Sequence, residues 1–550
     1  MSTPLGSTRR HFLKTSLATA GTAALSRHLA LGQSPAPAKY RRYNVTSPAG
    51  QRALASYAKA IRIMLKLPAD HPHNWFRNAF VHLMDCPHGN WWFYVWHRGY
   101  VGYFEQTIRN LSGDPTFAMP YWDWTQLPRI PDSMFDSVLT PIDSAYAPYT
   151  RDIDTFTSFI QPSLKRYWDA LSHAQIAQLN IRGYTSFDVM WNDVTGFTAT
   201  PPPPHIDPEN MAFAQTPGAR YLTRSNPRLS PQVTDNVSKE TVRGGLEPTH
   251  FFDPIKKISF NSSKRTSHNA SPAGAVFSTL EGLPHNSTHN YIGGVGPIPH
   301  GPWGNMTNNL SPVDPIFFLH HSNMDRLWDV WTRKQQALRL PYLPDKADLP
   351  AYEREPFLFY VDGNGHQVGP STAREYISMS RFDYDYEPGF GEELVKPGST
   401  LLKTTHPMAP AIGVLKGNGA SIMLSPNAVN SHLATDSPDT LFALVTLPLP
   451  TEISPNRNFD VLVGAPADVT QAAPDSPYYA GMISFFGGMM HMPGMTGDVT
   501  FIVPLPKRKE AFTGLKAGVV SDTRSVASTI RVVPSGGGAS VLKAATVRAL

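Results

Sequence analysis

Histidines at helical spacing are the residues of this chain with the clearest capacity for chemistry. The run Asp314-Pro-Ile-Phe-Phe-Leu-His-His-Ser-Asn-Met-Asp-Arg-Leu-Trp328 begins like a helix, because an aspartate can cap free amides and proline fits a first turn. His321 recurs at helical spacing with Phe317, Met324 and Trp328. A lone histidine on an apolar stripe is usually a hydrogen-bonded core residue. His321 therefore indicates a site only if other histidines join it.

Two further segments supply such histidines. In Pro284-His-Asn-Ser-Thr-His289 the imidazoles are four residues apart, hence on one helix face. In Cys86-Pro-His-Gly-Asn-Trp-Trp-Phe-Tyr-Val-Trp-His97 one histidine lies in a loop and the other on a helix, and His82 lies on a helical stripe just before them. Four amphipathic helices that each turn a histidine inward predict a bundle with a metal site in its core.

The ligand set narrows the choice of metal. It consists of six neutral imidazoles, those of His82, His88, His97, His285, His289 and His321. With no carboxylate among them and one cysteine in the chain, calcium, magnesium, iron-sulfur and di-iron carboxylate sites are disfavoured, and copper or zinc remain. Two groups of three, one before residue 100 and one after residue 280, predict a pair of equivalent sites suited to redox chemistry.

These segments resemble the two copper-site signatures of the type-3 copper proteins, namely tyrosinases, catechol oxidases and molluscan-type hemocyanins. The resemblance implies that His82, His88 and His97 bind one copper ion, and that His285, His289 and His321 bind the second, with His320 as the neighbour of the last ligand. Tyr94 departs from the first signature, where relatives usually carry an aliphatic residue, Phe or Pro. The loop between His82 and His88 is shorter than in relatives, which leaves His71 and His73 as alternatives to His82.

The resemblance extends to residues around the ligands. Cys86 precedes His88 by two residues, the arrangement in which fungal relatives form a thioether, and an unmodified buried thiol is the alternative. Glu281 and Asn286 resemble the water-holding pair of hydroxylating members and could orient a water as a base. A carboxylate at a helix start is the alternative for Glu281. Asp123 could hold a ligand imidazole by its other nitrogen or cap the next turn.

The resemblance implies a copper-dependent tyrosinase with two copper ions. Such an enzyme uses dioxygen to ortho-hydroxylate monophenols such as tyrosine and to oxidise o-diphenols (catechols) to o-quinones. Three alternatives stay open: a catechol oxidase without hydroxylase activity, a non-catalytic hemocyanin-like oxygen binder, and a zinc hydrolase. The sequence has no nucleic-acid motif and no phosphate loop, so neither nucleic acid nor a membrane is an expected partner, and it does not set the oligomeric state.

The N-terminus, Thr8-Arg-Arg-His-Phe-Leu-Lys14, matches the twin-arginine export pattern. The apolar stretch that follows is too short and too rich in Thr and Ser to span a membrane. We therefore expect a signal peptide over residues 1–32 and a periplasmic or secreted protein. Residues 1–32 hold four basic and no acidic groups, so the net charge falls from +5 to +1 on removal and the basic pI says little about partners.

The rest of the chain divides by composition. Residues 33–390 predict a mainly α catalytic core whose four-helix bundle holds the dicopper site and which ends near the tyrosine-rich segment 381–386. From 400 to 506, short apolar runs separated by Pro, Gly and Asn predict a small C-terminal β-sandwich, and Asn458-Phe-Asp-Val461 resembles the C-terminal domain of plant polyphenol oxidases. Residues 507–550, with eight basic and two acidic residues, predict a basic, flexible tail.

One glycine-rich stretch in the predicted sandwich could act on the copper site. Its thioethers and imidazole could hand on Cu(I), which soft ligands favour, or could simply fill gaps in the core. The residues concerned are Met489, Met490, His491, Met492 and Met495. Alternatively, Phe485 or Phe486 could plug the entrance to the active site in a latent form.

Overall fold

The computed structural model describes residues 38–195, 218–298, 301–369, 371–395, 410–416, 418–434, 440–449, 457–486, 496–512 and 526–550. The chain divides into the segment Met1–Lys39 and the compact unit Tyr40–Leu550, which holds all the elements below. The predicted signal peptide lies outside the described residues. So does the stretch with Met489, Met490, His491, Met492 and Met495.

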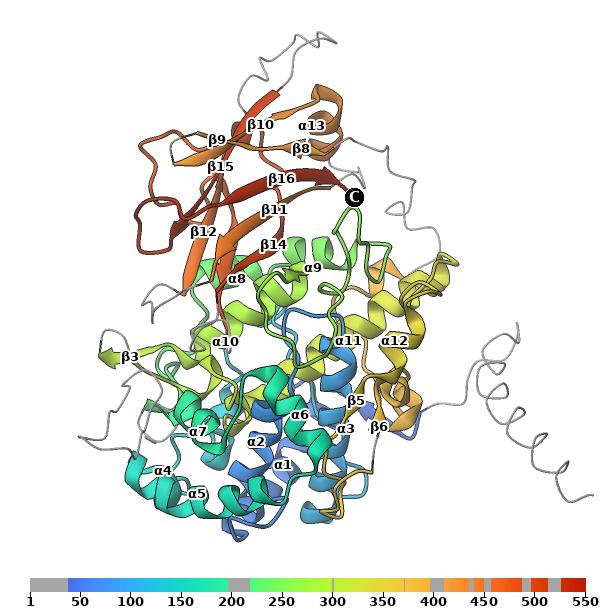
Figure 1. Cartoon of the computed structure of the whole chain (residues 1–550), viewed down its shortest axis with the longest axis vertical. Helices are drawn as coiled ribbons and strands as arrows, with labels where there is room; N and C mark the ends of the chain where they lie inside the picture. The colour runs from blue at the N-terminus through green and yellow to red at the C-terminus, as the bar shows by residue number, and fades with distance from the viewer. Residues whose placement is uncertain are drawn as a thin grey trace, which may run out of the picture. The chain divides into compact units, whose positions relative to one another are not determined.

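The predicted mainly α core is confirmed, and its principal helices are the amphipathic segments expected from the sequence (Figure 1). Ser47 caps the first of them, because its side chain accepts a hydrogen bond from the amide of Gly50, and the stripe through Tyr57 and Ile61 is buried. The helices that carry or brace the histidines are α1 (Pro48–Lys66), α2 (Trp75–Asp85), α3 (Phe93–Ser112), α10 (Asn286–Gly293) and α11 (Ile316–Ala337).

Further α-helices complete the described set. Their bounds are α4 (Ala147–Thr150), α5 (Ile153–Asp169), α6 (His173–Arg182), α7 (Phe187–Thr195), α8 (Pro231–Asn236), α9 (Lys239–Leu246), α12 (Leu349–Arg354) and, in the C-terminal domain, α13 (Pro426–Leu433). Three two-stranded sheets also occur among the described residues of the core. They pair β1 (Tyr40–Arg42) with β7 (Tyr384–Tyr386), β3 (Val295–Ile298) with β4 (Gly301–Trp303), and β5 (Pro356–Phe357) with β6 (Ser371–Thr372).

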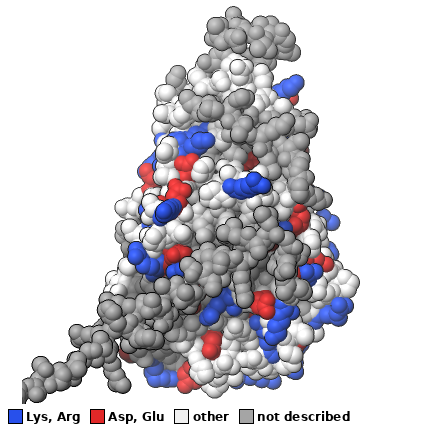
Figure 2. Space-filling view, turned by 90° about the vertical axis from the view of Figure 1, so that its right-hand side faces the viewer, with Lys and Arg blue, Asp and Glu red and all other residues white. Residues whose placement is uncertain are grey.

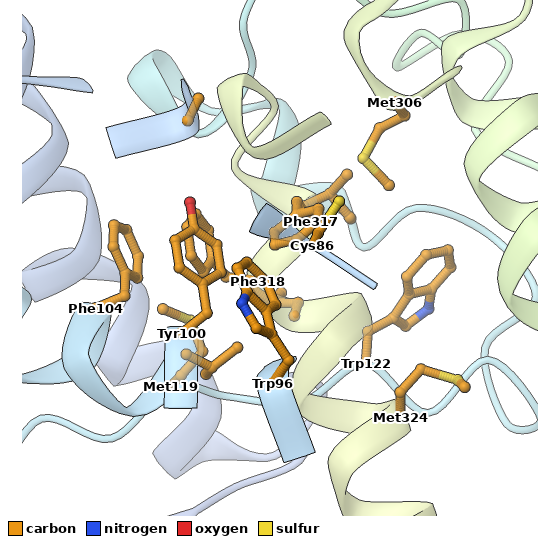
Figure 3. Close-up of a cluster of buried hydrophobic side chains, with 14 of the residues drawn as sticks. Cys86, Trp96, Tyr100, Phe104, Met119, Trp122, Met306, Phe317, Phe318 and Met324 are labelled. Atoms are coloured by element: carbon orange, nitrogen blue, oxygen red, sulfur yellow. The ribbon is translucent and has the colours of Figure 1, made fainter. Parts of the chain in front are cut away.

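Helices α3 and α11 pack through aromatic side chains. The rings of Phe104 and Phe318 are stacked with centroids 3.6 Å apart, and Tyr100 stacks on Phe318 at 5.7 Å (Figure 3). Large buried apolar areas of this kind dominate the stability of a core. The packing fixes the two helices that carry His97 and His321.

A buried ionic network ties the first strand of the core to the last. Arg42 donates to Glu105 and to Asp325, and Asp325 also accepts from Arg98. The hydroxyls of Tyr384 and Tyr386 donate to the same Asp325 carboxylate. Because every buried charge in this network has an opposite partner, its burial is tolerated. The network anchors α11 four residues after His321.

The C-terminal strands, orange to red in Figure 1, form a sandwich of two sheets, as predicted. In the described residues one sheet has the order β13-β12-β15-β10-β9, with bounds Tyr479–Ser484, Asn458–Val463, Val526–Pro534, Gly419–Leu424 and Val414–Lys416. The other has the order β2-β14-β11-β16-β8, with bounds Val276–Phe277, Asp498–Pro504, Leu441–Pro448, Ala544–Ala549 and Ala411–Ile412.

Strand β2 belongs to the sequence of the helical core but pairs in parallel with β14 of the sandwich. The stacked rings of Phe277 and Phe501, 5.0 Å apart, lie on these two strands. The two parts of the chain therefore share a sheet and a hydrophobic contact.

The prediction of a flexible tail over residues 507–550 is wrong for its described part. Strand β15 lies between β12 and β10, and β16 pairs along β11 from Leu441↔Ala549 to Thr446↔Ala544. Inward apolar residues such as Ile530, Val532 and Val547 are fully or almost fully buried. The sandwich therefore extends well beyond residue 506, because the last strands supply inner positions of both sheets.

No helix in the described ranges is long and apolar enough to cross a membrane. On the face shown in Figure 2, basic and acidic side chains of the described residues are interspersed.

Candidate metal centre

All six predicted ligand histidines lie in one cluster, in which five are buried and His88 is partly buried. His82 comes from α2, His97 from α3, His289 from α10 and His321 from α11, whereas His88 lies in the α2–α3 loop and His285 ends the wide helical turn 281–285 before α10. The two predicted trios face each other. The ring centroids of His97 and His321 are 4.2 Å apart, and those of His88 and His285 are 5.6 Å apart. Ligand atoms lie within 4.8 Å of one another in the group His285, His289, His320 and His321, and also in the group His82, His97 and His321.

Hydrogen bonds fix which nitrogen of four rings is protonated. The Nδ1 atoms of His82, His97 and His289 lie 2.7–2.8 Å from the carbonyl oxygens of Asn309, Phe93 and Met306. The Nδ1 of His285 lies 2.8 Å from Oδ1 of the adjacent Asn286. Carbonyl oxygens only accept, so each Nδ1 donates and each neutral ring keeps a lone pair on Nε2. This second interaction is the one that usually orients metal-bound histidines.

The lone pairs converge without partners. The Nε2 atoms of His82 and His97 are 3.3 Å apart, although both rings donate from Nδ1. Two acceptors at that distance repel each other unless a cation lies beside them. The Nε2 atoms of His88 and His285 are buried with no hydrogen-bond partner in the described part of the chain. One metal ion at each trio would satisfy all four atoms.

His320 differs from its neighbour His321. The indole Nε1 of Trp124 lies 3.0 Å from Nδ1 of His320, and an indole can only donate. When neutral, His320 therefore carries its proton on Nε2 and offers the cluster an N–H group rather than a lone pair. Nε2 of His321, by contrast, lies 3.2 Å from Nε2 of His289.

Burial sets the charge of the cluster. Desolvation lowers the pKa of His97 and of His285 to about 3. It also lowers the pKa of His82, His88, His289 and His321 well below the usual value, and repulsion between neighbouring imidazoles adds to the effect. The rings are therefore neutral at physiological pH, which is the form that binds metal.

Glu281 and Asn286 lie next to the cluster, each with protein partners. The Glu281 carboxyl accepts from the amide of Gly89 at 2.6 Å and from the hydroxyl of Ser262. Burial raises the pKa of Glu281 to about 8, although these hydrogen bonds oppose the shift. Asn286 binds His285 through Oδ1 and donates from Nδ2 to the carbonyl of Ser484 in β13 at 3.1 Å.

Cys86 is a buried thiol beside His88. Its Sγ lies 3.5 Å from Nδ1 of His88, and Arg182 donates to the carbonyl of Cys86 at 2.7 Å and to Sγ at 3.1 Å. Burial raises the pKa of the thiol to about 11, against the effect of Arg182. A cavity of about 40 Å³ opens here, with Cys86, His88, Arg182 and Phe486 in its lining. The thioether to His88 stays a prediction.

Phe486 covers the histidine cluster, whereas Phe485 does not. The ring centroid of Phe486 lies 4.2 Å from that of His289 and 5.1 Å from that of His88. Phe485 instead packs in the sandwich core, 5.9 Å from Phe501, and its carbonyl accepts from Asn290 of α10 at 2.7 Å. A hydrogen bond from α10 thus holds the backbone next to the covering ring.

Two other expectations from the sequence have different outcomes. His71 and His73 are not needed in place of His82, since Nε2 of His73 binds the carbonyl of Asp362 instead. The suggestion that Asp123 holds a ligand imidazole is wrong, because it accepts from Thr125 and Phe390 and lies 3.6 Å from Arg326. The cluster is supported from this segment by the next residue, Trp124. The only sequence signal for the role of Trp124 was its position directly after Asp123.

The chain resembles plant polyphenol oxidases in both sequence and fold. It is 26% identical over 317 residues to the chloroplastic polyphenol oxidase of Malus domestica, covering 54% of this chain and 41% of the relative. It is 26% identical over 363 residues to a chloroplastic latent polyphenol oxidase of Prunus armeniaca, covering 62% and 48%. The chain thus spans less than half the length of these two relatives.

Among solved structures, a latent aurone synthase (polyphenol oxidase) superposes with a TM-score of 0.54 at 18% identity. The match covers 94% of this chain and 91% of that one. At this identity the likeness concerns the fold, which comprises the helical core and the C-terminal β domain together.

The same relatives contradict the expected localisation. Both curated polyphenol oxidases are described as chloroplastic proteins of plants. The prediction of twin-arginine export to the periplasm or the medium is therefore wrong by this comparison. The Arg-Arg pattern that suggested it is a short motif and of low specificity.

A family model matches the histidine-bearing part of the chain. The common central domain of tyrosinase aligns with residues 60–334, which is half of the chain and contains all six predicted ligands. The chain therefore belongs to the tyrosinase family of type-3 copper proteins, which includes the polyphenol oxidases.

Proposed function

We propose that this protein is a copper-dependent tyrosinase that hydroxylates monophenols to o-diphenols and oxidises o-diphenols to o-quinones. The observation that carries the proposal is the convergence of unprotonated Nε2 atoms, exemplified by His82 and His97 at 3.3 Å, in a site where Glu281 is also buried. The converging Nε2 atoms suit a pair of metal ions. Glu281 lies beside them and can exchange protons near neutral pH.

Proteins of this family bind two copper ions, and the residues present fit that pair. Neutral imidazole is a preferred ligand of copper, and partnerless buried Nε2 atoms need a cation. His82, His88 and His97 would hold one ion, and His285, His289 and His321 the other. When bound, the copper pair supplies the redox chemistry with dioxygen that oxidises the phenol.

The chain's own residues supply orientation and proton transfer. The carbonyls of Asn309, Phe93 and Met306 hold three rings in the tautomer that binds metal. Glu281, four residues before His285, would accept the phenol proton, directly or through a water. Its pKa of about 8 places it near the optimum for general acid–base catalysis at neutral pH.

Copper content and oxygen uptake test this proposal together. We expect two copper ions per chain, and oxygen consumption with both tyrosine and a catechol. Oxidation of catechol alone would favour a catechol oxidase, which is the second candidate because the partners of Asn286 leave its polar atoms occupied. Copper binding without turnover would favour an oxygen carrier. Zinc in place of copper would contradict the proposal.

Substitution of Glu281 separates the two oxidation steps. In Glu281→Gln the amide cannot take a proton, so we expect monophenol hydroxylation to fall by roughly 100-fold, the lower range for loss of a general base. The rate of catechol oxidation should change by less than about threefold, because the histidines, and not Glu281, orient the catechol. Initial rates with both substrates, normalised to bound copper, measure the effect. Equal losses in both reactions would remove Glu281 from this role.

A further inference from the structure

A second cavity lies outside the histidine cluster, between α2, α5 and the turn near residue 361. Its volume is about 300 Å³, and its lining includes Arg77, Arg166, Tyr167 and Ser163. No histidine of the candidate metal centre contributes to it. Two guanidinium groups therefore share one cavity that the oxidase chemistry does not use.

Arg77 is the unusual member of this set. The residue is only 5% exposed, and its Nη1 is buried without a hydrogen-bond partner in the described part of the chain. Its guanidinium carbon lies 3.5 Å from the centre of the Tyr167 ring. The ring face attracts the cation but gives Nη1 no acceptor. A buried guanidinium without an acceptor is costly, so a ligand for it is expected.

The other charged groups do not neutralise Arg77. Arg166 donates to the hydroxyl of Ser163 at 2.8 Å. Asp70, the acidic residue in the lining, is exposed, and no ion pair joins it to either arginine in the described ranges. The buried charge of the cavity is thus the Arg77 guanidinium, whereas Arg166 and Asp70 are both exposed and screened by solvent.

Local helix geometry adds to this preference for negative charge. Arg77 is the third residue of α2, which begins at Trp75 after its cap Asn74. The N-terminal turn of a helix carries partial positive charge and favours anions. Guanidinium groups bind carboxylate or phosphate oxygens through paired N–H donors.

We propose that the cavity lined by Arg77 and Arg166 binds a small oxyanion, either a carboxylate or a phosphate. The anion would place a negative charge beside the Arg77 guanidinium, whose Nη1 lies beneath the cavity surface, and would link α2 to α5. Because α2 also carries His82, the bound anion would stabilise the helix that positions one ligand of the metal centre. A ligand that binds only the folded chain raises the stability of that chain by mass action.

Calorimetric titration of the full, copper-loaded chain tests the proposal. The probes are inorganic phosphate and acetate, each added at constant ionic strength set with sodium chloride. We expect saturable binding of one anion per cavity and a rise in the thermal unfolding midpoint. The two titrations show which oxyanion binds more tightly, and saturable binding supports the site if Arg77→Gln weakens it.

Variants distinguish this cavity from binding at copper. Arg77→Gln should weaken anion binding at least tenfold, and Arg166→Gln should weaken it less. Arg52→Gln, which removes an exposed arginine of α1, should leave binding unchanged. Absence of saturable binding by the unmodified chain overturns the proposal. Unchanged anion affinity in Arg77→Gln overturns it too. If Arg77→Gln does not fold, Arg166→Gln tests the site instead, and unchanged anion affinity in that variant overturns the proposal.

Discussion

At the scale of single residues, the acceptor on the far side of each imidazole decides the chemistry of the cluster. A carbonyl at Nδ1 leaves a lone pair at Nε2 in His82, His97 and His289, whereas an indole donor at Nδ1 of His320 does the opposite. The tautomer of His320 is thus set from outside its own helix, whereas Nδ1 of the adjacent His321 has no hydrogen-bond partner in the described part of the chain. The sequence signature is what favours His321 as the ligand.

A buried charged triad near the cluster makes stability depend on pH. His268 lies 2.9 Å from Asp85 and 2.7 Å from Glu355. Burial alone would lower its pKa, but Asp85 and Glu355 raise it to about 9. A pKa raised in the folded state contributes stability that is complete below the unfolded value of about 6.5 and is lost as pH rises through about 9.

Replacement of His268 should therefore matter most at low pH within the stable range. For His268→Gln we expect a loss of roughly 3 kcal/mol near pH 6, since each pKa unit corresponds to about 1.4 kcal/mol. The difference from the unmodified chain should shrink between pH 7 and pH 10, in which interval the native imidazolium titrates. Urea unfolding at several pH values measures it. A difference that does not vary with pH would show that His268 acts by packing alone.

At the scale of elements, close approach between α3 and the chain near Phe382 fixes the helix that carries His97. A Cβ atom added at Gly102 would lie 2.4 Å from the Phe382 ring, well inside van der Waals contact. For Gly102→Ala the clash should cost about 1–3 kcal/mol. The higher helix propensity of alanine offsets this cost by up to about 1 kcal/mol.

We expect Gly102→Ala to lower the thermal unfolding midpoint by about 1–2 °C, because the entropy of unfolding of so large a unit is about 1 kcal/mol/K. Gly369→Ala is the matched control, because no atom lies within 4 Å of the Cβ position there. It should leave the midpoint unchanged. Equal midpoints for the two variants would mean that Phe382 moves aside without cost.

The helical elements were predictable because amphipathic periodicity reflects burial directly. The stripe through Tyr57 and Ile61, and the histidines placed at helical spacing, follow from the sequence alone. The pairing of the strands, by contrast, was not predictable from the sequence. Strand β2 has two residues and pairs across more than two hundred positions with β14, which no local pattern encodes. The tail was misjudged because its net charge outweighed the alternation of residues such as Ile530 and Val532.

The candidate site shows the same division. The histidine set follows from spacing and family resemblance, and its six members meet in one cluster. The role of Trp124, and the occupation of Asn286 by β13, depend on contacts between distant segments. Such contacts are set by tertiary packing and leave no periodic signal.

At the scale of the whole molecule, the sandwich places one aromatic ring on the histidines. We propose that Phe486 holds the enzyme in a latent form, since its ring lies where a phenol would stack against His289. In Phe486→Ala we expect kcat/KM for catechol to rise at least tenfold, because the substrate no longer competes with a tethered ring. Oxygen uptake by the full-length chain measures it.

Phe485→Ala is the matched control for this substitution. It removes a ring of equal size from the sandwich core, so it should lower stability by roughly 3–5 kcal/mol without comparable activation. Similar activation by both variants would indicate general loosening of the sandwich. No activation by Phe486→Ala would show that the ring is not the barrier.

The position of β15 and β16 in the sheets has a consequence for biogenesis. Both strands leave the ribosome after every segment that contributes a histidine to the cluster, yet they occupy inner places in the two sheets. Until they are synthesised, the sandwich cannot close and Phe486 has no completed scaffold to hold it. Translation itself therefore leaves an interval in which the imidazoles can acquire metal before the finished chain seals them.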